Sequence, residues 1–346
     1  GRTNTTAIQS TLQTPFRERT NRAVALRESG INLTTTASYD HEAVRALVAD
    51  IAAYVTRDPV DAQIQSFDYA TRTFSFTESQ PGVTLDQDLL YERVTAALDR
   101  WESGVTVTVD PIVTEPAVTK DELVASFGLV AAYTTETTND SNRNTNIDLA
   151  CQAINGTALM PGETFSFNQA TGQRTTEKGY KSAGAIAAGQ SIEEVGGGIC
   201  QVSSTLFNAV ARANLEIVSR SPHAWPSTYV NIGEDATVNW PNLDFQFKNN
   251  TKSPIFIITY YKNRRMSAEI WGMSLGEGVT IDLQSTIIKT IDPPSEVKYE
   301  LNTDLPYGTE KTTVKARTGY VVETEKVWYK DCLLYTSDAA DDSLRV

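Results

Sequence analysis

The sequence predicts an α+β protein of several domains: a small α-β-β-α-β domain, then a mixed α/β domain, then an extended β module. Its 346 residues allow two or three domains at roughly 100–200 residues each. Some segments repeat apolar residues at helical spacing, whereas others alternate apolar and polar residues as strands do. A Pro-containing linker at 115–119 and a change to alternating β pattern after residue 278 mark the two boundaries.

The first domain is expected at 40–115. Residues 1–39 are rich in Thr, Arg and Asn, and we interpret them as the remnant of a preceding element with a short strand at 31–33. Asp40 is placed to cap a helix that stops at Asp58-Pro59. The pattern then predicts a hairpin at 62–68 and 73–77, a helix at 83–101 with Trp101 on its buried side, and a strand at 105–113.

The second domain is expected at 120–275 and begins with a polar, turn-rich segment at 133–146. A clear amphipathic helix at 199–214 follows three consecutive glycines. The remaining predicted elements are a helix at 147–155, a strand at 164–168, a loop at 172–189 and strands at 229–232, 236–239, 245–248, 255–261 and 266–271.

The third region, at 279–331, alternates apolar and polar residues and predicts a small β module. Its candidate strands are 279–283, 297–301, 313–315 and 321–328. Residues 332–346 break this pattern and resemble translated sequencing-adapter read-through, so we interpret them as an artefactual tail. The alternative for this segment is an ordinary acidic tail.

The composition limits the class of partner. The net charge of −13, from 30 Lys+Arg against 43 Asp+Glu, argues against nucleic acid, which needs a basic face. No apolar run reaches the about 18–20 residues of a membrane helix, and no signal peptide is visible. Because the chain starts with Gly1, we expect that an N-terminal anchor is missing from it and would be its link to a membrane.

Scarce residues limit the chemistry. The chain has three cysteines, Cys151, Cys200 and Cys332, and two histidines, His41 and His223. No CxxC or HExxH motif is present, so we expect no metal site and no cofactor. An odd number of widely spaced cysteines also argues against a disulfide framework.

Cys200 is the candidate nucleophile. It follows Gly196-Gly197-Gly198 at the start of the predicted helix, where unpaired N–H groups and the helix dipole stabilise a thiolate. Glycines allow close approach of a ligand, and backbone N–H groups at this turn could form an oxyanion hole. The candidate oxyanion and substrate-binding residues are Gly197, Gly198, Gln201, Ser203, Ser204 and Trp225.

His223 is the candidate general base. It lies between two prolines in Ser-Pro-His223-Ala-Trp-Pro, and a strand through Ile217-Val218 would return the chain toward the start of the Cys200 helix. Asp235 or Asp244 could orient the imidazole, and spacing does not choose between them.

Each of these residues also has a structural interpretation. A lone cysteine on a helix is usually a small buried hydrophobe, which suits Cys151 in its Ile/Ala stripe better than Cys200 after three glycines. A histidine in a loop is usually a surface residue, so His223 gains interest only from its pairing with Cys200. His41 lies beside a predicted helix cap and is interpreted as structural. Trp225 is either a core residue or the lining of a groove.

Longer segments give a specific resemblance. Residues 133–271 closely resemble the VanW family. The matching segments are Asn146-Ile-Asp-Leu-Ala, Met160-Pro-Gly-Glu-Thr-Phe-Ser-Phe-Asn168, Gly196-Gly-Gly-Ile-Cys-Gln-Val-Ser-Ser-Thr205, Pro222-His-Ala-Trp-Pro226, Asp235-Ala-Thr-Val238 and Asp244-Phe-Gln-Phe-Lys-Asn249. Residues 40–113 resemble the peptidoglycan-binding domain that often precedes it, and 279–330 resemble part of a β module named for its five glycines.

The resemblance implies an extracytoplasmic cell-envelope protein, usually anchored in the membrane, from a family named after a vancomycin-resistance gene cluster. Some members are linked to L,D-transpeptidation, which makes 3-3 peptidoglycan cross-links with a cysteine nucleophile. On this chain the nucleophile would be Cys200. The implied partners are the stem peptides and glycan of peptidoglycan.

Three functions remain open from the sequence. We place L,D-transpeptidation through a thioester first, with Cys200 as nucleophile and His223 as base. A non-catalytic peptidoglycan-binding scaffold is second, and in it Cys200 would be buried in a structural turn. A cysteine peptidase or amidase acting on the cell wall is third, because it uses the same Cys/His pair on another substrate.

Overall fold

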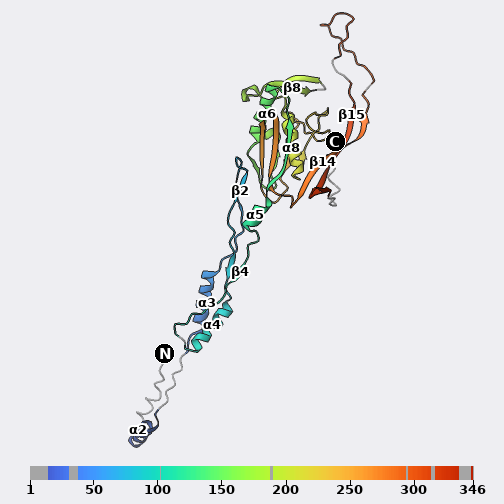
Figure 1. Ribbon diagram of the computed structural model, residues 1–346. Helices are drawn as coiled ribbons and strands as arrows, with labels where there is room; N and C mark the ends of the chain where they lie inside the picture. The colour runs from blue at the N-terminus through green and yellow to red at the C-terminus, as the bar shows by residue number, and fades with distance from the viewer. Residues whose placement is uncertain are drawn as a thin grey trace. The chain divides into compact units, whose positions relative to one another are not determined.

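The structure is a computed structural model that describes residues 15–30, 38–101, 103–187, 190–293, 295–312, 316–334 and 344–345 (Figure 1). The described residues combine helices with several small antiparallel sheets, which confirms the α+β class. The predicted strands at 31–33 and 313–315 lie outside the described residues, as does most of the 332–346 tail. Among the described helices, none has both the length and the apolar character to cross a lipid bilayer.

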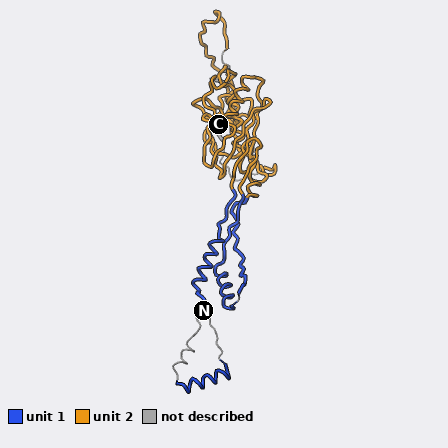
Figure 2. Tube along the Cα trace, turned by 90° about the vertical axis from the view of Figure 1, so that its left-hand side faces the viewer, with its two compact units in different colours: residues 1–62, 78–119 blue, residues 63–77, 120–346 orange. Residues whose placement is uncertain are grey.

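The chain forms two compact units (Figure 2). The first comprises residues 1–62 and 78–119, and the second comprises residues 63–77 and 120–346. The hairpin that we placed in the first domain therefore belongs to the second unit.

The first unit consists of helices and one short strand pair. Its described elements are α2 (Phe16–Ser29), α3 (His41–Val55), α4 (Gln87–Asp99), β3 (Gly82–Thr84) and β4 (Ile112–Thr114). The segment interpreted as a remnant thus contains a 14-residue helix, α2, with no buried residue. The Asp40 cap is confirmed, because its carboxylate accepts hydrogen bonds from the N–H groups of Glu42 and Ala43.

Two predictions for the first unit are wrong in their bounds. The helix predicted at 83–101 starts at Gln87, because Asp86 caps it and β3 takes the residues before it. Trp101 lies past the helix end with φ of 57° and is 67% exposed, so it is not on a buried face. The strand predicted at 105–113 is reduced to β4, which pairs within the described residues with the three-residue strand β3.

The hairpin of β1 (Ile64–Asp68) and β2 (Thr73–Phe76) forms as predicted. Its aromatic face packs on the second unit, with the ring centroid of Phe67 4.8 Å from that of Phe256. The guanidinium of Arg72 also donates two hydrogen bonds to the Glu269 carboxylate, at 2.8 and 3.2 Å. These contacts explain why the hairpin belongs to the second unit, although the residues on both sides of it in the sequence belong to the first.

A four-stranded antiparallel sheet and two helices build the core of the second unit. The strand order is β5 (Phe127–Glu136), β13 (Arg265–Met273), β12 (Ile255–Lys262) and β6 (Thr157–Leu159). Helices α6 (Ser141–Ile154) and α8 (Ile199–Arg212) lie beside this sheet (Figure 1). Every residue of α8 except Cys200 and Arg212 is buried.

The prediction of a turn-rich segment at 133–146 is wrong. Its first residues extend β5, where Tyr133 pairs with Ala268 of β13. Its last residues begin α6, because Asp140 caps that helix through the N–H of Arg143. Polar composition concealed both elements, since β5 is only partly buried and α6 carries its polar residues in its first two turns.

Smaller elements complete the second unit. They are α5 (Lys120–Ser126), α7 (Phe167–Thr171), the 3₁₀ turn Thr176–Lys178, the hairpin β8 (Ser182–Ala187) with β9 (Gln190–Val195), and a three-stranded sheet of β10 (Glu216–Ser219), β11 (Gln246–Lys248) and β7 (Thr164–Ser166). The loop predicted at 172–189 thus contains β8. The strands predicted at 229–232 and 236–239 are irregular, and the latter segment is held by hydrogen bonds to α8 and to Ser221.

The C-terminal region is a long antiparallel pair, β14 (Val279–Ile291) with β15 (Gly319–Lys330). Short strands β16 (Leu333–Leu334) and β17 (Leu344–Arg345) also pair with β15. The strand predicted at 297–301 is wrong, because these residues are irregular and exposed. Leu283 of β14 is 4% exposed and joins the core that contains α8.

Candidate functional site

The turn before Cys200 requires its glycines. Gly198 caps α8 with φ of 107°, a conformation that L side chains rarely adopt. A Cβ on Gly197 would lie 2.4 Å from the carbonyl oxygen of Ala183 in β8, and one on Gly198 would lie 2.9 Å from Cγ of Arg143. The turn therefore fits tightly between β8 and α6 and fixes where α8 begins.

Cys200 lies in the first turn of α8 and is half-buried. Its Sγ is 3.5 Å from the Thr237 hydroxyl and 3.4 Å from the Val238 carbonyl oxygen. Cys151, in contrast, is only 1% exposed, and burial raises the pKa of its thiol well above the ordinary value. The structure thus separates the two cysteines as the sequence predicted.

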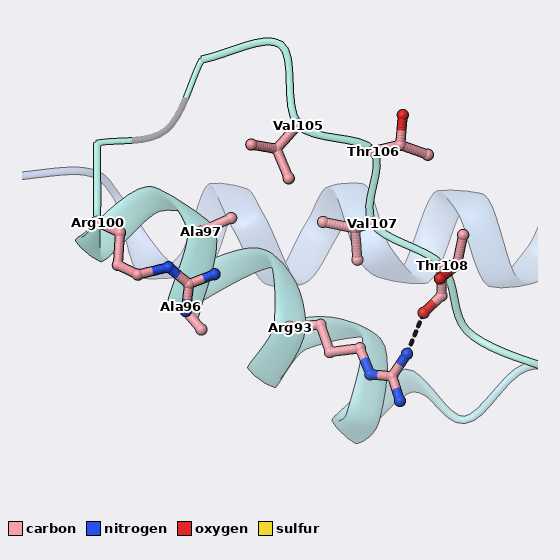
Figure 3. Close-up of a pocket in the computed structure, with 8 residues that line it drawn as sticks. All are labelled: Arg93, Ala96, Ala97, Arg100, Val105, Thr106, Val107 and Thr108. Carbon is pink, nitrogen blue, oxygen red and sulfur yellow. Dashed lines mark hydrogen bonds between the residues drawn. The ribbon is translucent and has the colours of Figure 1, made fainter.

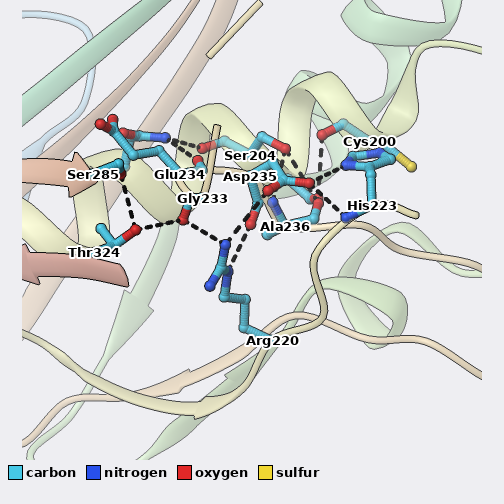
Figure 4. Close-up of polar contacts among 12 residues, drawn as sticks. Cys200, Ser204, Arg220, His223, Gly233, Glu234, Asp235, Ala236, Ser285 and Thr324 are labelled. Atoms are coloured by element: carbon cyan, nitrogen blue, oxygen red, sulfur yellow. Dashed lines mark hydrogen bonds and ion pairs between the residues drawn. The ribbon is translucent and has the colours of Figure 1, made fainter. Parts of the chain in front are cut away.

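His223 lies close enough to Cys200 for each side chain to shift the pKa of the other. Strand β10 reverses the chain after α8, and Ile217 in it pairs with Phe247 of β11. The imidazole Nδ1 contacts Oδ2 of Asp235, and the His223 backbone N–H donates to the same oxygen at 2.6 Å (Figure 4). Because Asp235 occupies Nδ1, the Nε2 edge is left for other partners, and the Tyr229 hydroxyl lies 3.5 Å from it.

The electrostatics of this group favour an ion pair. Burial alone would lower the pKa of His223, but Asp235 and Cys200 raise it to about 9. Burial alone would raise the pKa of Cys200, but His223, the Val238 backbone and the Thr237 hydroxyl together outweigh it, so that this pKa falls below the ordinary thiol value. Both shifts favour the thiolate–imidazolium form of the pair over the neutral form, and the thiolate is the reactive state of a cysteine nucleophile.

Asp235 is the carboxylate that reaches His223, and Asp244 is not. Burial would raise the Asp235 pKa, but hydrogen bonds from His223 and the charge of Arg220 lower it overall. Arg220 donates to the backbone oxygen of Asp235 at 2.6 Å and lies 3.5 Å from its Oδ1. Asp244 instead accepts from the Ser166 hydroxyl at 2.6 Å and the Asn168 N–H at 2.8 Å, next to α7.

Three predicted substrate-binding side chains point into the protein. Gln201 is 1% exposed and donates to the Thr135 hydroxyl and the Glu136 carbonyl. The hydroxyls of Ser203 and Ser204 are buried and donate to the carbonyl oxygen of Ala236. The two serines therefore hold the segment after Asp235 against α8, whereas Gln201 holds α8 against β5. That these side chains contact substrate stays a prediction, and in the structure all three hydrogen-bond to the protein.

The other predicted binding residues, Gly197, Gly198 and Trp225, lie within three residues of Cys200 or His223 along the chain. The Gly197 N–H donates to the Glu194 carbonyl oxygen at 3.2 Å, so that of these two glycines Gly198 stays the candidate oxyanion donor. Trp225, two residues after His223, is half-buried, with the Arg317 guanidinium carbon 3.7 Å from its ring centroid.

Sequence analysis missed Arg220, Tyr229 and Thr237. Arg220 precedes His223 by three residues, and a basic residue so near a candidate base could have been read as support for its carboxylate. Tyr229 and Thr237 gave no such signal, because they reach the pair from irregular segments.

A surface pocket and the arrangement of possible metal ligands bear on other kinds of chemistry. A shallow pocket of about 290 Å³ on the first unit is lined by two arginines with small, apolar and threonine residues: Arg93, Ala96, Ala97, Arg100, Val105, Thr106, Val107 and Thr108 (Figure 3). It holds no nucleophile or titratable base. Within the described part of the chain, no three His, Cys, Asp or Glu side chains cluster in a way that could hold a metal ion.

Segments of this chain match known protein families and relatives in sequence. Residues 142–271 match the family described as "VanW like protein", and residues 4–106 match the one described as "Putative peptidoglycan binding domain". The uncharacterized protein YoaR of Bacillus subtilis strain 168 is 32% identical over 299 residues, which are 86% of this chain and 94% of YoaR. The chain belongs to the VanW family.

A second relative shares only the VanW region. The vancomycin B-type resistance protein VanW of Enterococcus faecalis is 33% identical over 115 residues, 32% of this chain and 42% of that protein. No solved structure matches the chain. The VanW-family and peptidoglycan-binding regions together indicate a role related to the cell wall.

Proposed function

We propose that this VanW-family protein cross-links peptidoglycan as a cysteine L,D-transpeptidase. The observation that carries the proposal is the Cys200–His223–Asp235 chain, in which the pKa of the thiol is lowered and the pKa of the imidazole is raised. Such a chain has the three roles of nucleophile, acid–base and orienting carboxylate that acyl transfer requires.

In the proposed first half-reaction, the Cys200 thiolate attacks the carbonyl of the third residue of a tetrapeptide stem. The tetrahedral intermediate collapses, the bond to the terminal D-amino acid breaks, and the His223 imidazolium gives its proton to the leaving amine. A thioester to Cys200 remains, and His223 is neutral.

In the second half-reaction, a side-chain amine of a neighbouring stem attacks the thioester. His223 accepts the proton of that amine, a 3-3 amide bond forms, and the Cys200 thiolate is released with His223 protonated again. Water in place of the amine would give a carboxypeptidase. The peptidoglycan-binding region would hold the enzyme on the polymer and raise the local concentration of stems.

The test is mass spectrometry of muropeptides after incubation of peptidoglycan with the purified chain. We expect 3-3 dimers with the wild type and none with Cys200→Ala. Cys332→Ala is the matched control, because Cys332 is an exposed thiol outside this site. Equal dimer formation by Cys200→Ala would overturn the proposal.

A peptidoglycan-binding scaffold is the second candidate, and the match to a peptidoglycan-binding family favours it. A scaffold needs no activated thiol, so thiol-reactivity profiling separates the two: a reactive Cys200 supports the enzyme and an inert one supports the scaffold. A cell-wall peptidase or amidase is third, and cleaved stems without cross-links would identify it. For each, we propose an extracytoplasmic location with attachment to the membrane through an N-terminal anchor.

A further inference from the structure

The loop that carries Asp235 rests on the C-terminal β pair as well as on α8. Gly233 precedes Asp235 by two residues and has φ of 87°. A Cβ at this position would lie 2.6 Å from the Thr324 hydroxyl and 2.7 Å from Cγ1 of Val322, both in β15. Backbone and strand are thus in direct contact, and only glycine fits between them.

Polar contacts continue from this point to the catalytic pair (Figure 4). The Thr324 hydroxyl donates to the Gly233 carbonyl oxygen at 3.2 Å and is 2.9 Å from the Ser285 hydroxyl of β14. Arg220 donates to the same Gly233 carbonyl at 2.7 Å and to the Asp235 backbone oxygen at 2.6 Å. One carbonyl therefore joins β15 to the arginine that faces Asp235.

The β pair is anchored on either side of this contact. Thr324 is 0% exposed and Val322 is 5% exposed, so β15 is buried where it touches the loop. Arg212, at the end of α8, donates to Asp282 of β14 at 2.7 Å and lies 3.5 Å from Glu234 in the Asp235 loop. The base of the loop is therefore held between α8 and β14–β15.

We propose that β14–β15 is a positioning element of the Cys200 site and that Thr324 is its positioning residue: through Gly233 and Arg220 it holds Asp235 against His223. This inference rests on the proposed function, because positioning matters only if Cys200 is a nucleophile. Its test measures the reactivity of Cys200 and does not need the cross-linking reaction. It makes the C-terminal module a part of the catalytic centre, rather than a separate attachment to the wall.

The test follows the alkylation of Cys200 by iodoacetamide as a function of pH in the full chain, with the Cys200 peptide quantified by mass spectrometry. The charged or titratable groups that act on this thiol are His223, Arg174 and Tyr229, and none of them is altered. Thr324→Val keeps the side-chain shape and removes the donor. We expect it to raise the pH midpoint and to reduce alkylation below that midpoint by up to about fivefold, since one neutral hydrogen bond is lost.

Gly233→Ala forces loop and strand apart, and we expect a larger rise of about one pH unit, or about tenfold in alkylation. The controls are Thr286→Val, at an exposed position of the same strand pair, and Gly308→Ala, which has the same backbone strain with no neighbour within 4 Å. Both should retain the wild-type midpoint. If Gly233→Ala does not fold, the pH midpoint of Cys200 alkylation in Thr324→Val alone tests the inference.

A low wild-type midpoint that Thr324→Val leaves unchanged would overturn this inference and leave the proposed function intact. The reverse result, a raised midpoint in Thr324→Val with no 3-3 dimers from the wild type, would overturn the proposed function and support the positioning role. A wild-type midpoint at the ordinary thiol value would overturn both.

Discussion

Asp235 determines how strongly His223 can hold a proton beside Cys200. Its carboxylate is the partner that raises the imidazole pKa most, against a burial effect that would lower it. We expect Asp235→Asn to remove this support while it keeps the shape of the side chain. The imidazolium becomes less stable, the thiolate with it, and iodoacetamide labelling of Cys200 at pH 6 should fall about tenfold for each unit of pKa change.

The matched control for this substitution is Asp244→Asn. Asp244 is the second carboxylate that sequence alone could not distinguish, and it bonds to Ser166 and Asn168 instead of His223. Its substitution should leave the labelling profile of Cys200 unchanged. A wild-type profile in both variants would show that neither carboxylate acts on the pair.

The raised pKa of His223 sets the upper limit of the proposed reaction. Below about 9 the imidazole keeps the proton that the leaving amine needs, and above it that proton is lost. We therefore expect cross-linking to fall as pH rises through about 9, well above the fall near 6.5 that an ordinary histidine would give. Alkylation of Cys200 needs only the thiolate, so it should not fall over the same range. A decline of cross-linking near pH 6.5 would contradict this assignment.

At the scale of elements, the candidate site was more predictable than the fold around it. The glycines before Cys200, the helix after it and the prolines around His223 are local signals, and the structure brings these two residues together. The choice of Asp235 over Asp244 depends on where irregular loops fold back, and spacing carries no information on that. For the same reason Ser203 and Ser204 could not be recognised as the residues that hold the Asp235 segment against α8, nor Gln201 as a residue that holds α8 against β5.

The tight turn at the start of α8 gives a prediction about stability. Gly197→Ala would place a Cβ 2.4 Å from a backbone oxygen of β8, so the turn or the hairpin must move. We expect a loss of about 1–3 kcal/mol, which is usual for overpacking, and a lower Tm by differential scanning calorimetry. Gly184→Ala is the control, because Gly184 lies in the strand that the Gly197 Cβ would approach and a Cβ on Gly184 meets nothing within 4 Å. A wild-type Tm for Gly197→Ala would show that the turn adapts freely.

At the scale of the whole molecule, structural units do not follow the linear order of the sequence. Local patterns predicted the β1–β2 hairpin correctly, but its place in the first domain was inferred only from its position along the chain. In the structure its aromatic face joins Phe256 and Trp271 of the four-stranded sheet, where the ring centroids of Phe67 and Trp271 are 5.7 Å apart. Likewise, the β pair that follows residue 278 shares the core of α8 through Leu283. Long-range contacts of this kind leave no periodic signal in the sequence.

The hairpin should therefore stabilise the unit that holds Cys200. Phe67 is 8% exposed and lies among Tyr69, Phe74, Phe256 and Trp271. We expect Phe67→Ala to cost about 3–5 kcal/mol, the usual loss for a buried phenylalanine, and to increase hydrogen exchange of the β12 and β13 amides. Tyr54→Ala, at a position 92% exposed in the first unit, controls for loss of an aromatic ring and should leave both properties unchanged. Exchange in β12 and β13 that is as slow in Phe67→Ala as in the wild type would mean that the hairpin rests on the sheet without stabilising it.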